Sequence, residues 1–241
     1  MNKIIINNHA KSSLRQREIY RTLRTNIEFT GVENRVIAVT SCMPNDGKST
    51  VAYQLACAFA ESDKKVLLID ADLRKSVMVS RLKLSGQQKG LSHFLSGQAD
   101  VGDVLYSTNQ KNLYMMPSGV FPVNPTELLG NERFHKLLKA VKESFQYVIV
   151  DTPPLGSVID AAVAAQKCDG AILVLSANET SRNLARNVVD QLQAARVKIL
   201  GAVLNKVNVK QNGQYGRYYG AYYGHYGKGE ETAARETGVQ N

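Results

Sequence analysis

A phosphate-binding pattern constrains this chain more than any other feature, because Gly47-Lys48-Ser49 lies between an apolar β-branched run at 36–39 and a helical pattern at 51–61. In such a strand-loop-helix unit, loop N–H groups and the helix N-terminus face the phosphates, a lysine reaches the β and γ groups, and a hydroxyl binds Mg²⁺. The six-residue frame opens with Cys42 where glycine is usual, so the strand and helix on either side carry the prediction. The expected nucleotide contacts of this loop are Asp46, Gly47, Lys48, Ser49 and Thr50.

Short β-rich runs alternate with helical patterns over most of the chain. Alternation of this kind indicates a mostly parallel sheet with helices on both faces and right-handed crossovers. We therefore predict an α/β fold of the P-loop NTPase type, doubly wound, with ligands at the carboxyl ends of the strands. The predicted strands are 36–40, 66–70, 113–116, 147–151, 171–175 and 199–205, and the predicted helices include 51–61, 132–143, 158–166 and 182–195.

The composition changes abruptly after Val209, where glycine and tyrosine replace the apolar pattern. Such a stretch cannot build a core, so we predict a disordered tyrosine-rich tail at 210–241 after a phosphate-loop domain at 36–209. Residues 1–35 form an N-terminal region with seven Lys and Arg against three Glu, which is a large part of the formal net charge of +9. A basic excess of this kind is compatible with nucleic acid, anionic lipid or an acidic partner.

The three cysteines, Cys42, Cys57 and Cys168, lie far apart and form no CxxC pair. Their odd number and their spacing argue against a disulfide framework and against a zinc site, which predicts a reducing, cytoplasmic compartment. The chain has no apolar run near the ~20 residues that span a bilayer, and its N-terminus lacks the core of a signal peptide. We therefore expect a protein that is soluble by itself.

Two further strand ends carry carboxylates. Asp70 and Asp72 follow one apolar run, and Asp151 closes another in a pattern that resembles a Walker B element, whose aspartate holds Mg²⁺ directly or through water. An acid in such a place often only caps the next helix or solvates the turn. Because parallel strands end at one edge of the sheet, we expect these acids to converge near Lys48. That arrangement suits metal-assisted phosphoryl transfer.

The end of the last predicted strand partly indicates which nucleotide base the site binds. A guanine site usually has Asn-Lys-x-Asp there, whereas this chain has Asn205-Lys-Val-Asn208. The missing aspartate favours ATP over GTP. Asn205 is then either an adenine contact or a turn residue at the end of the strand.

Six tyrosines fall within twelve residues of the predicted tail and are spaced by glycines. Aromatic residues without a helical or alternating pattern do not indicate a core. They indicate either a stacking segment that binds nucleic acid or glycan, or hydroxyl groups that accept phosphate. The phosphoryl-transfer site favours the second interpretation. The six residues are Tyr215, Tyr218, Tyr219, Tyr222, Tyr223 and Tyr226.

Three Walker-type stretches, 41–50, 66–74 and 148–154, together with the tyrosine cluster resemble the bacterial tyrosine kinases, specifically the stand-alone cytoplasmic kinases of Gram-positive capsule and exopolysaccharide assembly. The resemblance covers essentially the whole chain. Its Asp-x-Asp-x-Arg motif is far more specific than the phosphate loop alone. The resemblance implies ATP- and Mg²⁺-dependent autophosphorylation of the tail tyrosines, which regulates polysaccharide synthesis and export.

The resemblance also implies roles for the site residues. Ser49, Asp72 and Asp151 would organise Mg²⁺, and Lys48 would stabilise charge on the transferred group. A tyrosine hydroxyl has a pKa near ~10 and benefits from a nearby base. Motif position assigns that role to Asp70, although Asp70 and Asp72 can exchange duties. The expected catalytic residues are Lys48, Asp70, Asp72, Arg74 and Asp151.

The N-terminal region predicts an amphipathic helix with two separate stripes. The apolar stripe can dock on the domain, and in the resembled family the charged stripe meets the neighbouring subunit of a ring-shaped homo-oligomer, an octamer. The alternative is a solvated helix face with fortuitous spacing. The apolar stripe is Ile19, Leu23 and Ile27, and the charged stripe is Glu18, Arg21 and Arg24.

Partners also follow from the resemblance. A separately encoded transmembrane adaptor of the polysaccharide co-polymerase type would activate the chain and recruit it to the inner face of the cell membrane. A cognate tyrosine phosphatase would reverse the modification. No nucleic acid is expected.

Two rival functions and one plain structural reading remain open. A positioning ATPase of the MinD/ParA kind shares the fold, but it usually has a second lysine where this chain has Met43, and it lacks a tyrosine ladder. A nucleotide-switched nucleic-acid-binding module is opposed by the tail's net charge of only about +1. The stretch at 119–129 resembles the kinases, yet Asn124 as N-cap with Pro125 and Glu127 would start a helix in any case.

Overall fold

The computed structural model describes residues 2–7, 13–84 and 88–208, and within them eight strands form one sheet. Across the sheet the order is β1-β4-β5-β3-β6-β2-β7-β8, with neighbours parallel except for β4 against β5. The predicted doubly wound, mostly parallel architecture is therefore confirmed. The strands are β1 (Asn2–Lys3), β2 (Val36–Ser41), β3 (Val66–Asp70), β4 (Tyr106–Ser107), β5 (Leu113–Met116), β6 (Tyr147–Asp151), β7 (Gly170–Ser176) and β8 (Ile199–Asn205).

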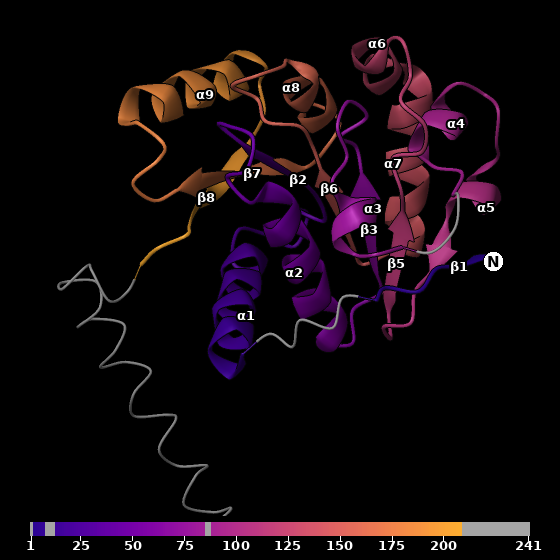
Figure 1. Ribbon diagram of the computed structural model, residues 1–241, viewed down its shortest axis with the longest axis horizontal. Coiled ribbons are helices and arrows are strands. Elements are labelled where there is room, and N and C mark those ends of the chain that lie inside the picture. Colours follow the sequence, from indigo (N-terminus) through magenta and orange to yellow (C-terminus); the bar gives the residue numbers. More distant parts are fainter. Residues whose placement is uncertain (1, 8–12, 85–87, 209–241) are drawn as a thin grey trace, which may run out of the picture. The chain divides into compact units, whose positions relative to one another are not determined.

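Helices cover both faces of this sheet (Figure 1). One face carries α1 (Leu14–Glu28), α2 (Lys48–Glu61) and α3 (Met78–Arg81). The opposite face carries α4 (Leu91–Leu95), α5 (Val101–Val104), α6 (Pro125–Gly130), α7 (Glu132–Ser144), α8 (Asp160–Ala165) and α9 (Arg182–Ala194).

The central strands are buried on both faces, which explains why their sequences are continuously apolar rather than alternating. In β2, Ile37 and Val39 belong to the core beneath α2, whereas Val36 and Ala38 belong to the cores of the opposite face. Successive side chains of a strand point to opposite faces, so one short apolar run supplies two cores.

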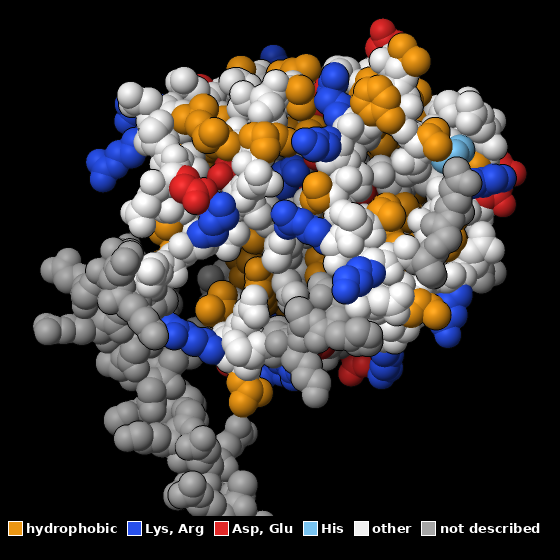
Figure 2. All heavy atoms as spheres, viewed as in Figure 1, with side chains coloured by type: hydrophobic (Ala, Val, Ile, Leu, Met, Phe, Trp, Pro, Cys, Tyr) orange, Lys and Arg blue, Asp and Glu red, His pale blue; other side chains and the backbone are white. Residues whose placement is uncertain are grey.

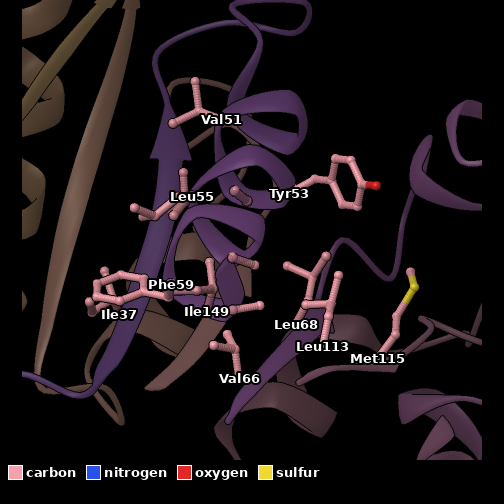
Figure 3. Packing of buried hydrophobic residues seen from close by; sticks show 14 of the residues in the cluster. Ile37, Val51, Tyr53, Leu55, Phe59, Val66, Leu68, Leu113, Met115 and Ile149 are labelled. Atoms are coloured by element: carbon pink, nitrogen blue, oxygen red, sulfur yellow. The ribbon is translucent and has the colours of Figure 1, made fainter. Parts of the chain in front are cut away.

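Helix α2 is held against the sheet by its apolar side chains. Val51, Leu55 and Phe59 lie over strand residues that include Leu68 and Ile149, as Figure 3 shows. Burial of each such side chain stabilises the fold by about 1.5–3 kcal/mol. This packing fixes the first turn of α2 at the carboxyl end of β2, where the phosphate loop lies.

Several elements differ from the sequence predictions. Helix α2 begins at Lys48 rather than at residue 51, and α8 covers Asp160–Ala165 rather than 158–166. The short elements β1, β4, α3, α4 and α5 were not predicted. Two-residue strands and helices of four or five residues span about one period of the apolar pattern, so periodicity gives no signal for them.

Helix α1 packs on α2, as the predicted apolar stripe requires, but the stripe is rotated. Ile19 is 49% exposed, so its assignment to the docked face was wrong. Tyr20, Leu23 and Ile27 contact the core instead. The helix begins after Ser13, whose side chain accepts a hydrogen bond from the Gln16 N–H group.

Helix α6 begins as predicted, with Asn124 as N-cap and Pro125 in the first turn. The Asn124 side chain makes no capping bond to the helix backbone. It donates to Glu127 Oε2 at 2.6 Å instead. The two side chains therefore satisfy each other rather than closing a capping box.

Internal contacts divide the chain into Met1–Asn205 and Lys206–Asn241. The sheet and the helices above all belong to the first unit. The predicted tail at 210–241, with its six tyrosines, lies outside the described residues. Within the described ranges, no helix combines the length and the apolar character needed to cross a bilayer.

Candidate active site

The phosphate loop connects β2 to α2, and a hydrogen bond between two of its own residues stabilises it. The Asp46 carboxylate accepts a hydrogen bond from the Met43 N–H group at 2.8 Å, and Asp46 is buried. Asn45 and Gly47 both have positive φ angles, 69° and 98°. Gly47 is the N-cap of α2, and the left-handed backbone there favours glycine. The predicted nucleotide contact Asp46 therefore shapes the loop with its carboxylate.

Asn205, at the end of β8, braces the same loop from the other side. Its Nδ2 donates to the Asp46 carbonyl oxygen at 2.8 Å. A Cβ on Gly47 would collide with this amide group. The sequence left two roles open for Asn205, an adenine contact or a turn residue at the end of a strand. The observed hydrogen bond is made at the end of β8, and it joins this strand to the phosphate loop.

Lys48 is the first residue of α2, and its Nζ lies 3.3 Å from Asp72 Oδ2. Both side chains are largely buried. The other Asp72 oxygen accepts a hydrogen bond from the Lys75 N–H group at 3.0 Å. The lysine of the phosphate loop and the predicted second carboxylate motif thus lie next to each other, as their strand-end positions predict.

Asp70 and Asp151 lie side by side on neighbouring strands, where β3 pairs with β6. Both are buried, and Ser76 donates its hydroxyl to Asp70. Burial and the neighbouring Asp151 raise the pKa of Asp70 well above the ordinary range. Burial also raises the pKa of Asp151, although the Lys48 charge and the Ser49 hydroxyl oppose that rise.

The donor set fits a magnesium ion bound together with a nucleotide. Asp151 Oδ1 is buried and has no hydrogen-bond partner among the described residues, and the Ser49 hydroxyl lies beside this carboxylate. Within the same residues, no group of three or more His, Cys, Asp or Glu could cage a metal. Magnesium in phosphoryl-transfer sites usually takes one or two carboxylates and completes its shell with phosphate oxygens and water.

A cavity of about 230 Å³ opens in front of these groups. Figure 2 shows Lys and Arg side chains gathered on this face between α2 and α8. Asp70 and Asp151 do not line the cavity, because they lie behind its wall. The lining residues are Pro44, Asn45, Gly47, Lys48, Ser49, Asp72, Arg74, Lys75, Val77, Arg81, Pro154, Ser157 and Val158.

Arg81 was not predicted from the sequence. It closes the short helix α3, and its Nη1 donates to the hydroxyl of Thr50 at 2.7 Å. A lone arginine on a four-residue helix has no motif that would have identified it. The predicted nucleotide contact Thr50 therefore accepts a hydrogen bond from Arg81, a basic side chain that lines the cavity.

Arg74 lies on the cavity wall, but its guanidinium group is turned toward a buried acid. Nε donates to Asp160 Oδ2 at 2.7 Å, and Nη2 donates to Asp160 Oδ1 and to the Thr126 hydroxyl, each at 3.2 Å. Neither Asp160 nor Thr126 was predicted. Their contacts reach Arg74 from 86 and 52 residues away, a distance over which one sequence gives no pairing signal.

The predicted interface residues on α1 do not share one environment. Glu18 and Arg21 form an exposed ion pair. Arg24 is mostly buried and donates from Nη1 to the Ala58 carbonyl oxygen of α2 at 3.2 Å. The outward-facing part of the charged stripe is thus Glu18 and Arg21, while Arg24 also holds α1 against α2.

Comparison with known proteins extends these findings. The AAA domain family matches residues 34–202. Tyrosine-protein kinase CpsD of Streptococcus agalactiae is 44% identical over 214 residues, which cover 88% of this chain and 93% of that protein.

Solved structures of a tyrosine kinase domain and of an ATPase are also similar to this chain. The kinase domain of the Escherichia coli tyrosine kinase ETK superposes with a TM-score of 0.77 at 34% identity and covers 84% of this chain and 78% of that one. The cell division ATPase MinD of Pyrococcus furiosus superposes with a TM-score of 0.63 at 28% identity, with 73% of each chain covered.

Proposed function

Because the chain belongs to the bacterial tyrosine-protein kinases, we propose that it transfers the γ-phosphoryl group of ATP to tyrosine hydroxyl groups of its own C-terminal cluster. One observation carries the proposal. Lys48 contacts Asp72 in the lining of a cavity, and two further buried carboxylates, Asp70 and Asp151, lie behind that lining. This is the charge arrangement that metal-assisted phosphoryl transfer needs.

The reaction forms a bond from the tyrosyl oxygen to the γ-phosphorus and breaks the bond from that phosphorus to the bridging oxygen. ADP leaves, and the hydroxyl proton passes to a carboxylate. Mg²⁺, held by Ser49, Asp72 and Asp151, neutralises phosphate charge when it is bound. Lys48 exchanges its contact with Asp72 for the phosphates and stabilises their developing charge.

Asp70 is the proposed acceptor of the tyrosyl proton. Motif position assigns this role, and the raised pKa of Asp70 means that the carboxyl group must first lose its own proton before it can accept that of the tyrosine. Asp72 lines the cavity beside Lys48, and this position suits a metal ligand better. Asp70→Asn should then lower kcat and leave the Mg²⁺ requirement unchanged, whereas Asp72→Asn should raise the Mg²⁺ concentration at half-maximal rate. The reverse pattern would exchange the two roles.

The proposal is tested by incubating the full chain with Mg-ATP and the cytoplasmic segment of its activator. Phosphotyrosine in Tyr215–Tyr226 is then mapped by mass spectrometry, beside a Lys48→Met control. We expect label in the native chain and none in the control. A chain that hydrolyses ATP without labelling these tyrosines would be an ATPase and not an autokinase.

The partners belong to the same proposal. A transmembrane adaptor would activate the chain and bring it from the cytoplasm to the membrane, a cognate phosphatase would remove the label, and the activity would regulate capsular or extracellular polysaccharide synthesis and export. A ring-shaped homo-oligomer, an octamer, would place one copy's tail at the next copy's cavity. The exposed Glu18–Arg21 pair supports an α1 contact between copies.

Phosphorylation is expected to loosen that ring. Six phosphotyrosines would add roughly −9 to −12 charges, which would cancel the formal net charge of +9. Native mass before and after ATP treatment measures the effect. An intact ring at high phosphate occupancy would refute it.

A positioning ATPase is the second candidate, because the fold also resembles MinD. Met43 stands where such ATPases usually have a second lysine, which argues against it. A nucleotide-switched module that binds nucleic acid is the third. Nucleic-acid binding that strengthens at low salt and survives Lys48→Met would favour it.

A further inference from the structure

A polar cluster of four hydrogen bonds includes Arg74, which lines the same cavity as Lys48. Besides the three bonds from Arg74, the Thr126 hydroxyl donates to Asp160 Oδ1 at 2.6 Å. The Asp160 side chain is 1% exposed, whereas that of Arg74 is 39% exposed. The cluster thus has a buried acidic end and a cationic end that faces the open cavity.

The geometry fixes the plane of the guanidinium group. Two parallel N–H···O bonds to one carboxylate define both its position and its orientation, which a single point-charge contact does not. Thr126 adds a third bond through Nη2. The structure gives no bond from Arg74 Nη1 to any described residue, and Arg74 lines the cavity. The clamp therefore leaves N–H groups of Arg74 available to the cavity.

The cluster also joins the connection that carries Asp72 to the helix that follows the Asp151 strand. Arg74 lies two residues after Asp72, in the connection that follows β3. Asp151 is the last residue of β6, and Asp160 is the first residue of α8, the next helix along the chain. The Arg74–Asp160 pair therefore ties the connection after β3 to α8, and Thr126 ties the same pair to α6.

Resting on the proposed phosphoryl transfer, we infer that Asp160 and Thr126 are positioning residues for that reaction. They hold the Arg74 guanidinium on the cavity wall, where it contacts the transferred phosphoryl group, and they tie the connection that carries Asp72 to α8 and α6. Neither residue touches the reacting atoms. Their effect on the reaction passes through Arg74.

The test compares Asp160→Asn, Thr126→Val and Thr126→Ser in the full chain. ADP formation is measured in a single turnover, with the protein in excess over Mg-ATP, beside nucleotide affinity and the thermal midpoint. Loss of a supporting group commonly costs about 10–100-fold, which we expect for Asp160→Asn in the rate. Loss of one hydrogen bond costs about 2–10-fold, which we expect for Thr126→Val. Thr126→Ser keeps the hydroxyl and should restore the rate, and ATP affinity should change less than the rate in every case.

A double-variant cycle separates positioning from simple structural damage. In an Arg74→Met background, Asp160→Asn and Thr126→Val should lower the rate by less than about twofold, because the group that they hold is gone. Asp190→Asn removes the same charge from an exposed position on α9 and should behave like the native chain. If Asp160→Asn fails to fold, the Thr126→Val and Thr126→Ser pair decides the question alone.

Two results would overturn the inference. One is a native single-turnover rate in folded Thr126→Val or Asp160→Asn. The other is an equal loss of rate in the presence and absence of Arg74. ADP forms whether water or a tyrosyl hydroxyl accepts the phosphoryl group, so these outcomes are distinguishable from failure of the tyrosine-kinase proposal, in which the native chain would release ADP but form no phosphotyrosine.

Discussion

Substitution of Gly47 by alanine tests how the phosphate loop is held. A Cβ at this position would collide with the Nδ2 of Asn205. It would also be placed on a residue whose φ is +98°. The substitution therefore introduces two separable costs, one in the backbone of residue 47 and one in the bond from Asn205 to the Asp46 carbonyl oxygen.

The two costs can be estimated separately. A non-glycine residue in left-handed backbone costs about 1–2 kcal/mol. Displacement of the Asn205 amide costs about 0.5–1.5 kcal/mol for the lost hydrogen bond and a similar amount for an off-rotamer side chain. Gly47→Ala should thus lower the free energy of unfolding by about 2–5 kcal/mol. In an Asn205→Ala background only the backbone cost remains, so the two substitutions should show a coupling of about 1–3 kcal/mol.

Urea denaturation of the nucleotide-free chain measures all four members of this cycle. Gly102→Ala is the matched control, since a Cβ there meets nothing within 4 Å. It should be neutral or stabilise by about 0.4–1 kcal/mol. If Gly47→Ala and Asn205→Ala were additive within about 0.5 kcal/mol, Asn205 would not brace the loop in solution.

Three further outcomes follow from the charges and burial at the site. Lys48→Met leaves Asp72 without its cation and should destabilise the nucleotide-free chain by about 3 kcal/mol, and a native urea midpoint would contradict this. Because the pKa of Asp70 is raised, the folded chain keeps a proton that the unfolded chain releases, so the free energy of unfolding should fall as the pH rises from about 4 toward neutrality. Asp70→Asn should make this fall less steep when denaturation is measured in EDTA. An unchanged slope would exclude Asp70 as the source of the pH dependence. Burial and Asp46 raise the pKa of Cys42 to about 11, so iodoacetamide at pH 8 should alkylate this thiol about 100-fold more slowly in the native chain than in urea, and equal rates would contradict its burial.

Sequence alone was sufficient for the parts of the site that follow from strand ends. The central strands β3 and β6 begin and end where their apolar runs do, because both of their faces are buried and the pattern stops at the sheet edge. Parallel strands end at one edge of the sheet, so the acids were expected to converge there, whereas the pairing of β3 with β6 that puts Asp70 beside Asp151 comes from the structure. The phosphate loop was readable for the same reason, since it connects such a strand to a helix.

The rest of the site depends on contacts that no local pattern records. The clamp on Arg74 joins α6, α8 and the connection after β3, and none of its members belongs to the same element. On α1, two sets of apolar residues satisfy helical spacing: the predicted set of residues 19, 23 and 27, and the observed set of residues 20, 23 and 27. Only the position of α2 decides that Tyr20 faces the core and Ile19 faces water.

The strand order has a consequence for how the chain matures during synthesis. The phosphate-loop strand β2 is paired on one side with β6 and on the other with β7. Val36 therefore cannot pair until Val148 has been synthesised, and Ile37 cannot pair with β7 until Gly170 has been synthesised. The hydrogen bond that holds the loop comes from Asn205, which ends β8, the last strand in the described part of the chain. A ribosome-bound chain therefore carries an unpaired apolar strand through most of its translation, and its nucleotide pocket is among the last parts to form, so premature termination anywhere before residue 205 should yield a product without a completed ATP site.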